Sequence, residues 1–223
     1  MKLIHISKTF FPGSSKEVKA LTDINLTFEK GEFTTLSGES GSGKTTLLNI
    51  IGGLERPTEG KIFFDGLELT ALSDEQMADF RLHHMGFIFQ AYNLISVLTV
   101  RENIGFIMKL LDYREDEINN RINELASVLQ IENILDNLPG QISGGQQQRV
   151  AVARAVASKP KLILADEPTA NLDSKNSQRL MEMLRALNEK EQVTVIFASH
   201  DKYVLAESKR TIVLDDGAVI EDR

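Results

Sequence analysis

The 223-residue sequence contains no cysteine, which excludes disulfide bonds and thiolate zinc sites. No apolar run approaches the roughly 20 residues that a membrane helix needs, and the N-terminus lacks the apolar segment of a signal peptide. We therefore expect a cytosolic chain, so that any membrane-spanning part of its assembly would belong to another chain. The formal charge of −7 argues against a broad nucleic-acid-binding surface, which is normally basic.

The most informative stretch is a glycine-rich loop between two apolar segments, residues 33–36 and 47–51. The first segment predicts a strand and the second a buried helix, which is the context expected of a phosphate-binding P-loop. Glycines let backbone N–H groups converge on one point, and the helix start adds partial positive charge there. The loop consists of Gly38, Glu39, Ser40, Gly41, Ser42, Gly43, Lys44, Thr45 and Thr46. We expect Lys44 to reach terminal phosphates and the Thr45 hydroxyl to reach a magnesium ion.

Hydrophobic patterning predicts an α/β domain with two sheets. Residues 2–6 alternate weakly, as an edge strand would, and with residues 21–28 and 61–64 they predict a small antiparallel sheet. Near-continuous apolar strands separated by helices imply a mostly parallel sheet covered on both faces. These strands are expected at residues 33–36, 86–90, 161–167 and 193–198, with a short helix at 201–208 and a final hairpin at 211–220. Residues from about 91 to 158 are mostly helical by pattern, so we expect one domain over residues 1–223 with a helical subdomain there.

Polar residues follow three of the predicted parallel strands. Gln90 ends the strand at 86–90, Asp166 and Glu167 end the strand at 161–167, and His200 follows the strand at 193–198. Because ligands of open α/β sheets bind at the carboxyl ends of the strands, the side chains of Asp166, Glu167 and His200 are expected beside the P-loop. One carboxylate could hold magnesium and the other could receive a proton from attacking water. A lone histidine is more often structural, so the pattern alone leaves the role of His200 open.

A second candidate anion site lies at the start of a predicted helix. Ser143 and Gln146 have the spacing of a capping box, and Gly144 and Gly145 lie between them with their backbone amides exposed at the helix start. Capping chemistry alone favours a simple, well-capped helix. Two phosphate-binding helix starts would be hard to use on one nucleotide unless they act across a dimer.

In this order along the whole chain, the motifs resemble those of the ATP-binding cassette ATPases. The set comprises residues 38–46, Gln90, residues 143–146, residues 162–167, residues 171–173 and His200. The Ser-Gly-Gly-Gln motif at 143–146 distinguishes this family from other P-loop proteins. The resemblance implies a P-loop NTPase with the ABC-ATPase fold, which has a mostly parallel core sheet, an antiparallel β subdomain and a helical subdomain.

The same resemblance implies ATP as the nucleotide and Mg²⁺ as the cofactor. It implies that Lys44 holds phosphates and that Thr45, Gln90 and Asp166 complete the metal site. The remaining implied roles are water activation by Glu167, a γ-phosphate contact by His200, a link between subunits by Asp173 and adenine stacking by Phe11, with Phe10 as the alternative.

The implied assembly is a head-to-tail homodimer with two ATP molecules between a P-loop of one subunit and Ser143, Gly144, Gly145 and Gln146 of the other. The dimer would power a permease on another chain, from the cytoplasmic face of the cell membrane. Segments 86–94, 98–103 and 144–150 are similar to the lipoprotein-releasing and macrolide-exporter type. An amino-acid-type importer ATPase and a non-transport regulatory ATP-binding module remain the alternatives.

Overall fold

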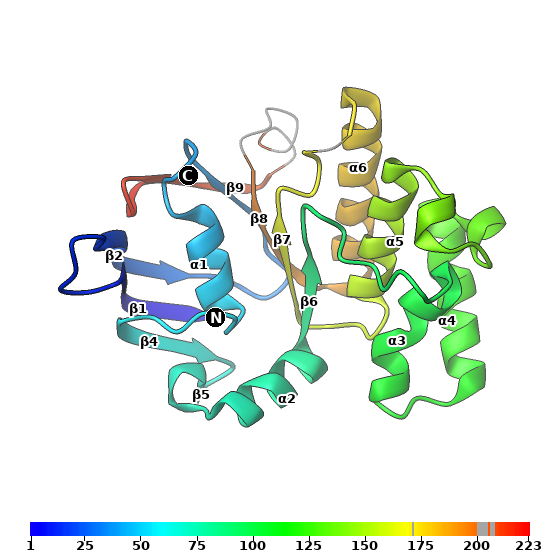
Figure 1. The fold of residues 1–223 in the computed structure, drawn as a ribbon, viewed down its shortest axis with the longest axis horizontal. Coiled ribbons are helices and arrows are strands. Elements are labelled where there is room, and N and C mark those ends of the chain that lie inside the picture. The colour runs from blue at the N-terminus through cyan, green and yellow to red at the C-terminus, as the bar shows by residue number, and fades with distance from the viewer. Residues whose placement is uncertain (171, 200–204, 206–207) are drawn as a thin grey trace.

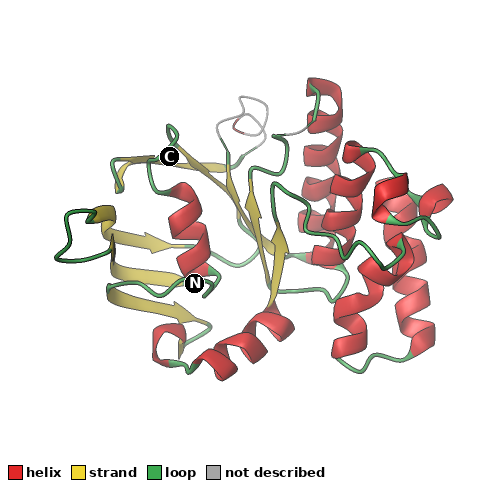
Figure 2. Cartoon of the chain, in the orientation of Figure 1, coloured by secondary structure: helices red, strands yellow, loops and turns green. Residues whose placement is uncertain are grey.

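The computed structural model describes residues 1–170, 172–199, 205 and 208–223, which form two β-sheets with helices between and beside them (Figures 1 and 2). Within these residues, a four-stranded antiparallel sheet has the order β2-β1-β4-β5. Its strands are β1 (Lys2–Phe10), β2 (Val18–Thr27), β4 (Glu59–Phe64) and β5 (Leu67–Glu68). The predicted antiparallel sheet is confirmed, but the prediction of β1 as an edge strand is wrong. β1 lies between β2 and β4, and register shifts along it obscure the alternation that marks a paired strand.

The second sheet has six strands among the described residues, in the order β10-β9-β3-β8-β7-β6. β3, β6, β7, β8 and β9 run parallel, and β10 pairs antiparallel with β9, so the prediction of a mostly parallel sheet is confirmed. The strands are β3 (Phe33–Ser37), β6 (Met85–Ile88), β7 (Leu162–Asp166), β8 (Thr194–Ala198), β9 (Arg210–Asp215) and β10 (Ala218–Asp222).

Helix α1 (Lys44–Ile51) lies between the two sheets, and the other long helices lie on the opposite side of the parallel sheet or at its end (Figure 1). The start of α2, α3 and α5 each carries a capping box, which supports the predicted starts at residues 73, 99 and 143. The helices are α2 (Asp74–His84), α3 (Val100–Leu110), α4 (Glu115–Leu129), α5 (Gly144–Val156) and α6 (Ser174–Glu191). Short 3₁₀ helices occur at η1 (Leu69–Ala71), η2 (Glu132–Ile134) and η3 (Pro139–Gln141).

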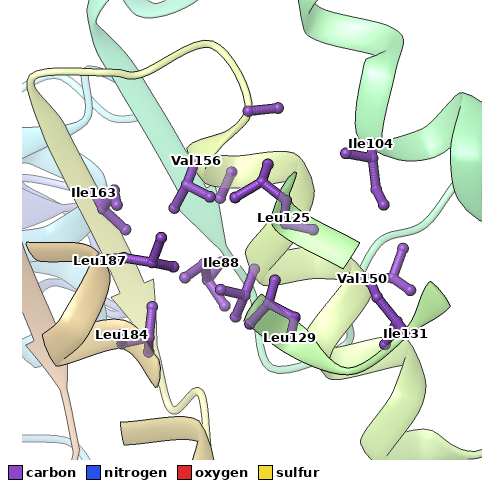
Figure 3. Close-up of a cluster of buried hydrophobic side chains, with 14 of the residues drawn as sticks. Ile88, Ile104, Leu125, Leu129, Ile131, Val150, Val156, Ile163, Leu184 and Leu187 are labelled. Carbon is purple, nitrogen blue, oxygen red and sulfur yellow. The ribbon is translucent and has the colours of Figure 1, made fainter. Parts of the chain in front are cut away.

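Two hydrophobic clusters hold these layers together. One surrounds α1 between the sheets, and the other joins the parallel sheet to the helices α3 to α6. Figure 3 shows the second cluster, in which Val156 of α5 and Ile88 of β6 lie between the side chains of α6 and β7 and those of α4. Each fully buried side chain of this size stabilises the fold by about 1.5–3 kcal/mol, so the second cluster fixes the helical layer to the sheet.

Most of the predicted helix at 201–208, together with His200 and Asn171 of the family motifs, lies outside the described residues. Within the described part of the chain, none of the helices combines the length and the apolar character needed to cross a membrane.

Candidate active site

The register of the parallel sheet brings the predicted site residues to one edge. Ala198 of β8 pairs with Leu36 of β3 and with Asp166 of β7, so these strands end at the same level. The segments that follow them carry the P-loop and Glu167 into a cleft of about 1130 Å³. Gln90, which comes after β6 at the same edge, also lines this cleft. The prediction that these motifs share one sheet edge is confirmed for the residues that the structure describes.

The P-loop wraps around the ammonium group of Lys44, the first residue of α1. Lys44 Nζ donates to the carbonyl oxygens of Gly38 at 2.8 Å and Glu39 at 2.7 Å, and it lies 3.4 Å from Ser42 Oγ. An ammonium group has three N–H donors, and the contact with Ser42 is long. Lys44 therefore keeps one weakly used donor, which a phosphate oxygen in the cleft could accept.

Glycine is required at the entrance of the loop for a steric reason. Gly38 has φ +147°, and a Cβ atom there would lie 2.2 Å from the carbonyl oxygen of Leu214 in β9. No side chain fits at that distance, because the obstacle is backbone that β9 holds in place. The loop thus approaches β9 as closely as only a glycine allows.

A hydroxyl and a carboxylate meet beside the loop. Thr45 Oγ1 donates to Asp166 Oδ1 at 3.1 Å, although the two residues are 121 positions apart. Burial raises the pKa of Asp166 above its ordinary value, against the lowering effect of the Thr45 hydroxyl, and the neighbouring Glu167 raises it further. Two oxygen ligands of this kind, next to a phosphate site, are what Mg²⁺ prefers, and a cation there would offset the cost of burying the carboxylate.

Glu167 is held in an unusual backbone conformation at the rim of the cleft. Its φ is +49°, in the left-handed region, and its backbone N–H donates to the carbonyl of Ala198 at 2.9 Å. Non-glycine residues in this region cost about 1–3 kcal/mol and persist where the surroundings fix them, commonly at functional sites. β8 therefore fixes the position from which the Glu167 carboxylate enters the cleft.

The aromatic side of the cleft differs from the prediction. Phe10, the last residue of β1, lines the cleft, whereas Phe11 does not and is 67% exposed. Strand β1 continues through Phe10, and the chain turns at Phe11, whose φ is +50°. Lys8 Nζ lies 4.9 Å from the centre of the Phe10 ring. Of the two phenylalanines, Phe10 therefore lies where a group bound in the cleft could contact it.

Sequence reasoning missed two walls of the cleft. One is the start of β2, and the other is the β9–β10 turn, where Gly217 N–H donates to the carbonyl of Ser42 at 3.2 Å. The missed residues are Val18, Lys19, Ala20, Asp216 and Gly217. The only sequence signal was the Asp-Gly turn, which predicts a hairpin but does not say that the hairpin touches the P-loop.

The second candidate anion site lies apart from this cleft. None of the residues from Ser143 to Gln146 belongs to the described lining of the cleft. Ser143 Oγ accepts from the Gln146 backbone N–H at 3.4 Å, and the Ser143 N–H donates to Gln146 Oε1 at 2.9 Å, as the predicted capping box requires. Asp173 in turn caps α6, because its carboxylate accepts from the Asn176 N–H at 2.9 Å, and this bond lowers the Asp173 pKa.

Residues 21–170 match the family model described as "ABC transporter". The chain is 42% identical to the uncharacterized ABC transporter ATP-binding protein MJ0796 of Methanocaldococcus jannaschii, over 98% of this chain and 94% of that protein. It is 39% identical to the bacitracin export ATP-binding protein BceA of Halalkalibacterium halodurans, over 98% of this chain and 86% of BceA. It is 42% identical to the macrolide export ATP-binding/permease protein MacB of Aggregatibacter actinomycetemcomitans, over 100% of this chain but only 35% of MacB.

A solved dimeric structure of the MJ0796 cassette superposes with a TM-score of 0.91 at 40% identity, covering 100% of this chain and 97% of that one. A second solved structure shows the same cassette as a dimer in a post-hydrolysis state, bound to ADP and Pi. The fold and the P-loop cleft define a nucleotide-binding ATPase. The chain belongs to the ABC transporter family, as an ATP-binding subunit that hydrolyses ATP.

Proposed function

We propose that this chain, as a single ATPase domain with a helical subdomain, works as a head-to-tail homodimer that closes around two ATP molecules and drives a separate membrane permease. The observation that carries the proposal is that the two candidate anion sites of one chain lie apart from each other. The cleft holds the P-loop but not the capped start of α5 at Ser143. A second subunit can bring its own α5 start to the γ-phosphate, where the helix dipole and free amides would stabilise the charge.

In the proposed mechanism the residues of the cleft act mainly by positioning and charge stabilisation. The P-loop amides and Lys44 hold the phosphates, and Thr45, Gln90 and Asp166 hold Mg²⁺, which supplies charge neutralisation when bound. Glu167, fixed by its bond to β8, orients the attacking water and accepts its proton.

Further roles rest on the family resemblance. His200, which lies outside the described residues, would contact the γ-phosphate, and Asp173 would link the subunits. Phe10 replaces Phe11 as the proposed adenine-stacking residue, since it lines the cleft.

The proposed partner is a permease of the export type, which would hold the chain at the cytoplasmic face of the cell membrane. Support comes from the relatives BceA and MacB, the first named for bacitracin export and the second for macrolide export. The proposed docking surface is the segment 90–98, called the crossing segment below, which leaves the cleft and runs toward α3. Val97 of this segment is 79% exposed, whereas Leu94 packs against the hydrophobic cluster of the helices. Charged substitutions at Val97 or Tyr92 should prevent assembly with the permease while the isolated ATPase stays folded.

The dimer is tested with the Glu167→Gln variant, which should retain ATP in its site. Size-exclusion chromatography with light scattering should give a dimer in ATP and a monomer in ADP, because only ATP supplies the γ-phosphate. Adding Ser143→Arg should block the dimer without weakening nucleotide binding to the monomer. A Glu167→Gln protein that stays monomeric in ATP at high concentration would contradict a sandwich formed by this chain alone.

A further inference from the structure

The crossing segment begins at the nucleotide cleft and passes along α5 on its way to α3 (Figure 1). Its first residue, Gln90, lines the cleft. Two residues further on, Tyr92 and Asn93 have φ of +59° and +49°, so two consecutive non-glycine residues adopt the left-handed conformation. Such a turn is sparsely populated in free chains and persists only where its surroundings fix it.

Arg154 of α5 supplies that fixation. Its Nη1 donates to the carbonyl of Asn93 at 2.6 Å, and its Nη2 donates to the carbonyl of Tyr92 at 2.9 Å. The side chain is half-buried, and no carboxylate in the described part of the chain pairs with it. Burial also lowers the pKa of its guanidinium. A rigid two-pronged donor on two successive carbonyls therefore fixes the turn to α5.

A second contact lies at the other end of the same helix. The Tyr92 hydroxyl lies 3.1 Å from the position that a Cβ atom would occupy at Gly144, in the first turn of α5. The crossing segment thus contacts α5 beside Ser143 through the Tyr92 ring and near its C-terminal end through Arg154. The later part of the crossing segment is held by Asn103 of α3, whose buried amide donates to the carbonyls of Ile95 and Leu98 at 3.1 and 2.9 Å.

We propose that Arg154 is a positioning residue that links Gln90, in the subunit's own nucleotide cleft, to the α5 start at Ser143, which meets the nucleotide of the other subunit. The inference rests on the proposed head-to-tail dimer. A shift of Gln90 on nucleotide binding displaces the carbonyls of Tyr92 and Asn93. The pair of guanidinium hydrogen bonds from Arg154 to these carbonyls, called the fork below, transmits that displacement to α5. Without the fork, the two ends of this connection move independently.

The test uses a parent that carries Glu167→Gln and Ala91→Cys. The chain has no other cysteine, so a spin label at the exposed residue 91, next to the turn that Arg154 holds, is unique. Arg154→Met removes the fork and keeps an aliphatic stem, while Arg154→Lys keeps the charge without the fork. The matched control is Arg149→Met on the same helix. Arg149 Nη1 donates to the carbonyls of Leu129 and Gln130 at the end of α4, and its Nε makes a long 3.4 Å contact with the Gly145 carbonyl, but none of its hydrogen bonds among the described residues reaches the crossing segment.

All variants should bind ADP as monomers within about twofold of the parent, because no contact of the P-loop changes. Coupling between sites is typically worth ~5–150-fold, so Arg154→Met should raise the dimer Kd in ATP at least about tenfold. Arg154→Lys should fall between parent and Arg154→Met, and Arg149→Met should stay within about threefold. The spin label at residue 91 should become more mobile in the Arg154→Met monomer, but not in the control.

An unchanged dimer Kd in Arg154→Met, or an equal loss in Arg149→Met, would overturn the proposed link. An unchanged label mobility in the Arg154→Met monomer would overturn the anchor itself. A parent that stays monomeric in ATP would instead contradict the dimer. The labelled monomer then tests the anchor alone, since the mobility of the label at residue 91 can be compared between variants without a second subunit.

Discussion

Lys44 and Glu167 line the same cleft, and their surroundings predict that loss of Lys44 weakens ATP binding whereas loss of Glu167 slows hydrolysis. Lys44 Nζ uses two of its three donors on the carbonyls of Gly38 and Glu39, at 2.8 and 2.7 Å. One donor is thus left for a phosphate, and a hydrogen bond that involves a charged group is worth about 1.5–3 kcal/mol. Lys44→Ala should therefore weaken ATP binding by about 10- to 150-fold.

Glu167→Gln should leave ATP affinity within about threefold and slow hydrolysis by ~10²–10⁴-fold, the usual effect of losing a positioned base. Glutamine has nearly the same shape as glutamate, and the left-handed backbone with its bond to Ala198 is unaffected by the change. The variant should therefore fold and bind like the parent. It lacks only the group that receives a proton from water.

The assay has two parts, an equilibrium titration with a fluorescent ATP analogue and a measurement of phosphate release. Lys161→Ala is the control for a lysine remote from the P-loop, since Lys161 pairs with Asp65 at 2.7 Å just before β7 begins. It should change neither quantity. Equal losses of affinity in Lys44→Ala and Glu167→Gln would refute the separate roles of phosphate binding and water activation, as would normal turnover in Glu167→Gln.

Three further outcomes are expected. Phe10→Ala should weaken ATP binding about five- to tenfold in the same titration, whereas Phe11→Ala should not, because only Phe10 lines the cleft. Gly38→Ala should lower the free energy of unfolding by about 1–3 kcal/mol in urea and abolish nucleotide binding, since its Cβ would lie 2.2 Å from a β9 carbonyl. The pKa of Glu124 is lowered from 4.5 to about 2, chiefly by Lys190. That carboxylate therefore stabilises the fold above pH 4.5 and ceases to do so as the pH falls toward 2. Glu124→Gln should cost about 1 kcal/mol at pH 7, after allowance for solvent screening, and the difference from wild type should shrink between pH 5 and pH 3.

Local chemistry explains why so much of the fold and the site could be predicted. The P-loop, the apolar strands and the capping boxes at Ser73, Thr99 and Ser143 are contiguous patterns, in which the residues that interact are neighbours in sequence. The sheet edge was predictable because parallel strands share one direction, so residues after each strand must gather at one end. Thr45 and Asp166 meet for this reason, although 121 positions separate them.

Predictions were wrong or absent where the outcome depends on register between distant segments. Which phenylalanine faces the cleft depends on the register shifts of β1, and those shifts follow from its pairing with β2 and β4 on either side. The β9–β10 turn reaches the P-loop because β9 pairs with β3, a contact that the turn residues themselves do not encode.

Arg154 is the clearest case of a role that only tertiary structure reveals. In the sequence it is one polar residue among the apolar positions of a helix, which usually indicates an exposed face. In the fold its two donors instead meet the carbonyls of Tyr92 and Asn93, 62 and 61 positions away. The left-handed turn presents both carbonyls to one side, where two N–H groups of a single guanidinium can donate to them. The left-handed turn thus provides acceptors for a charged residue of α5, and that residue in turn stabilises the turn. Together they connect the cleft that binds ATP with the helix whose start would contact the ATP of the other subunit.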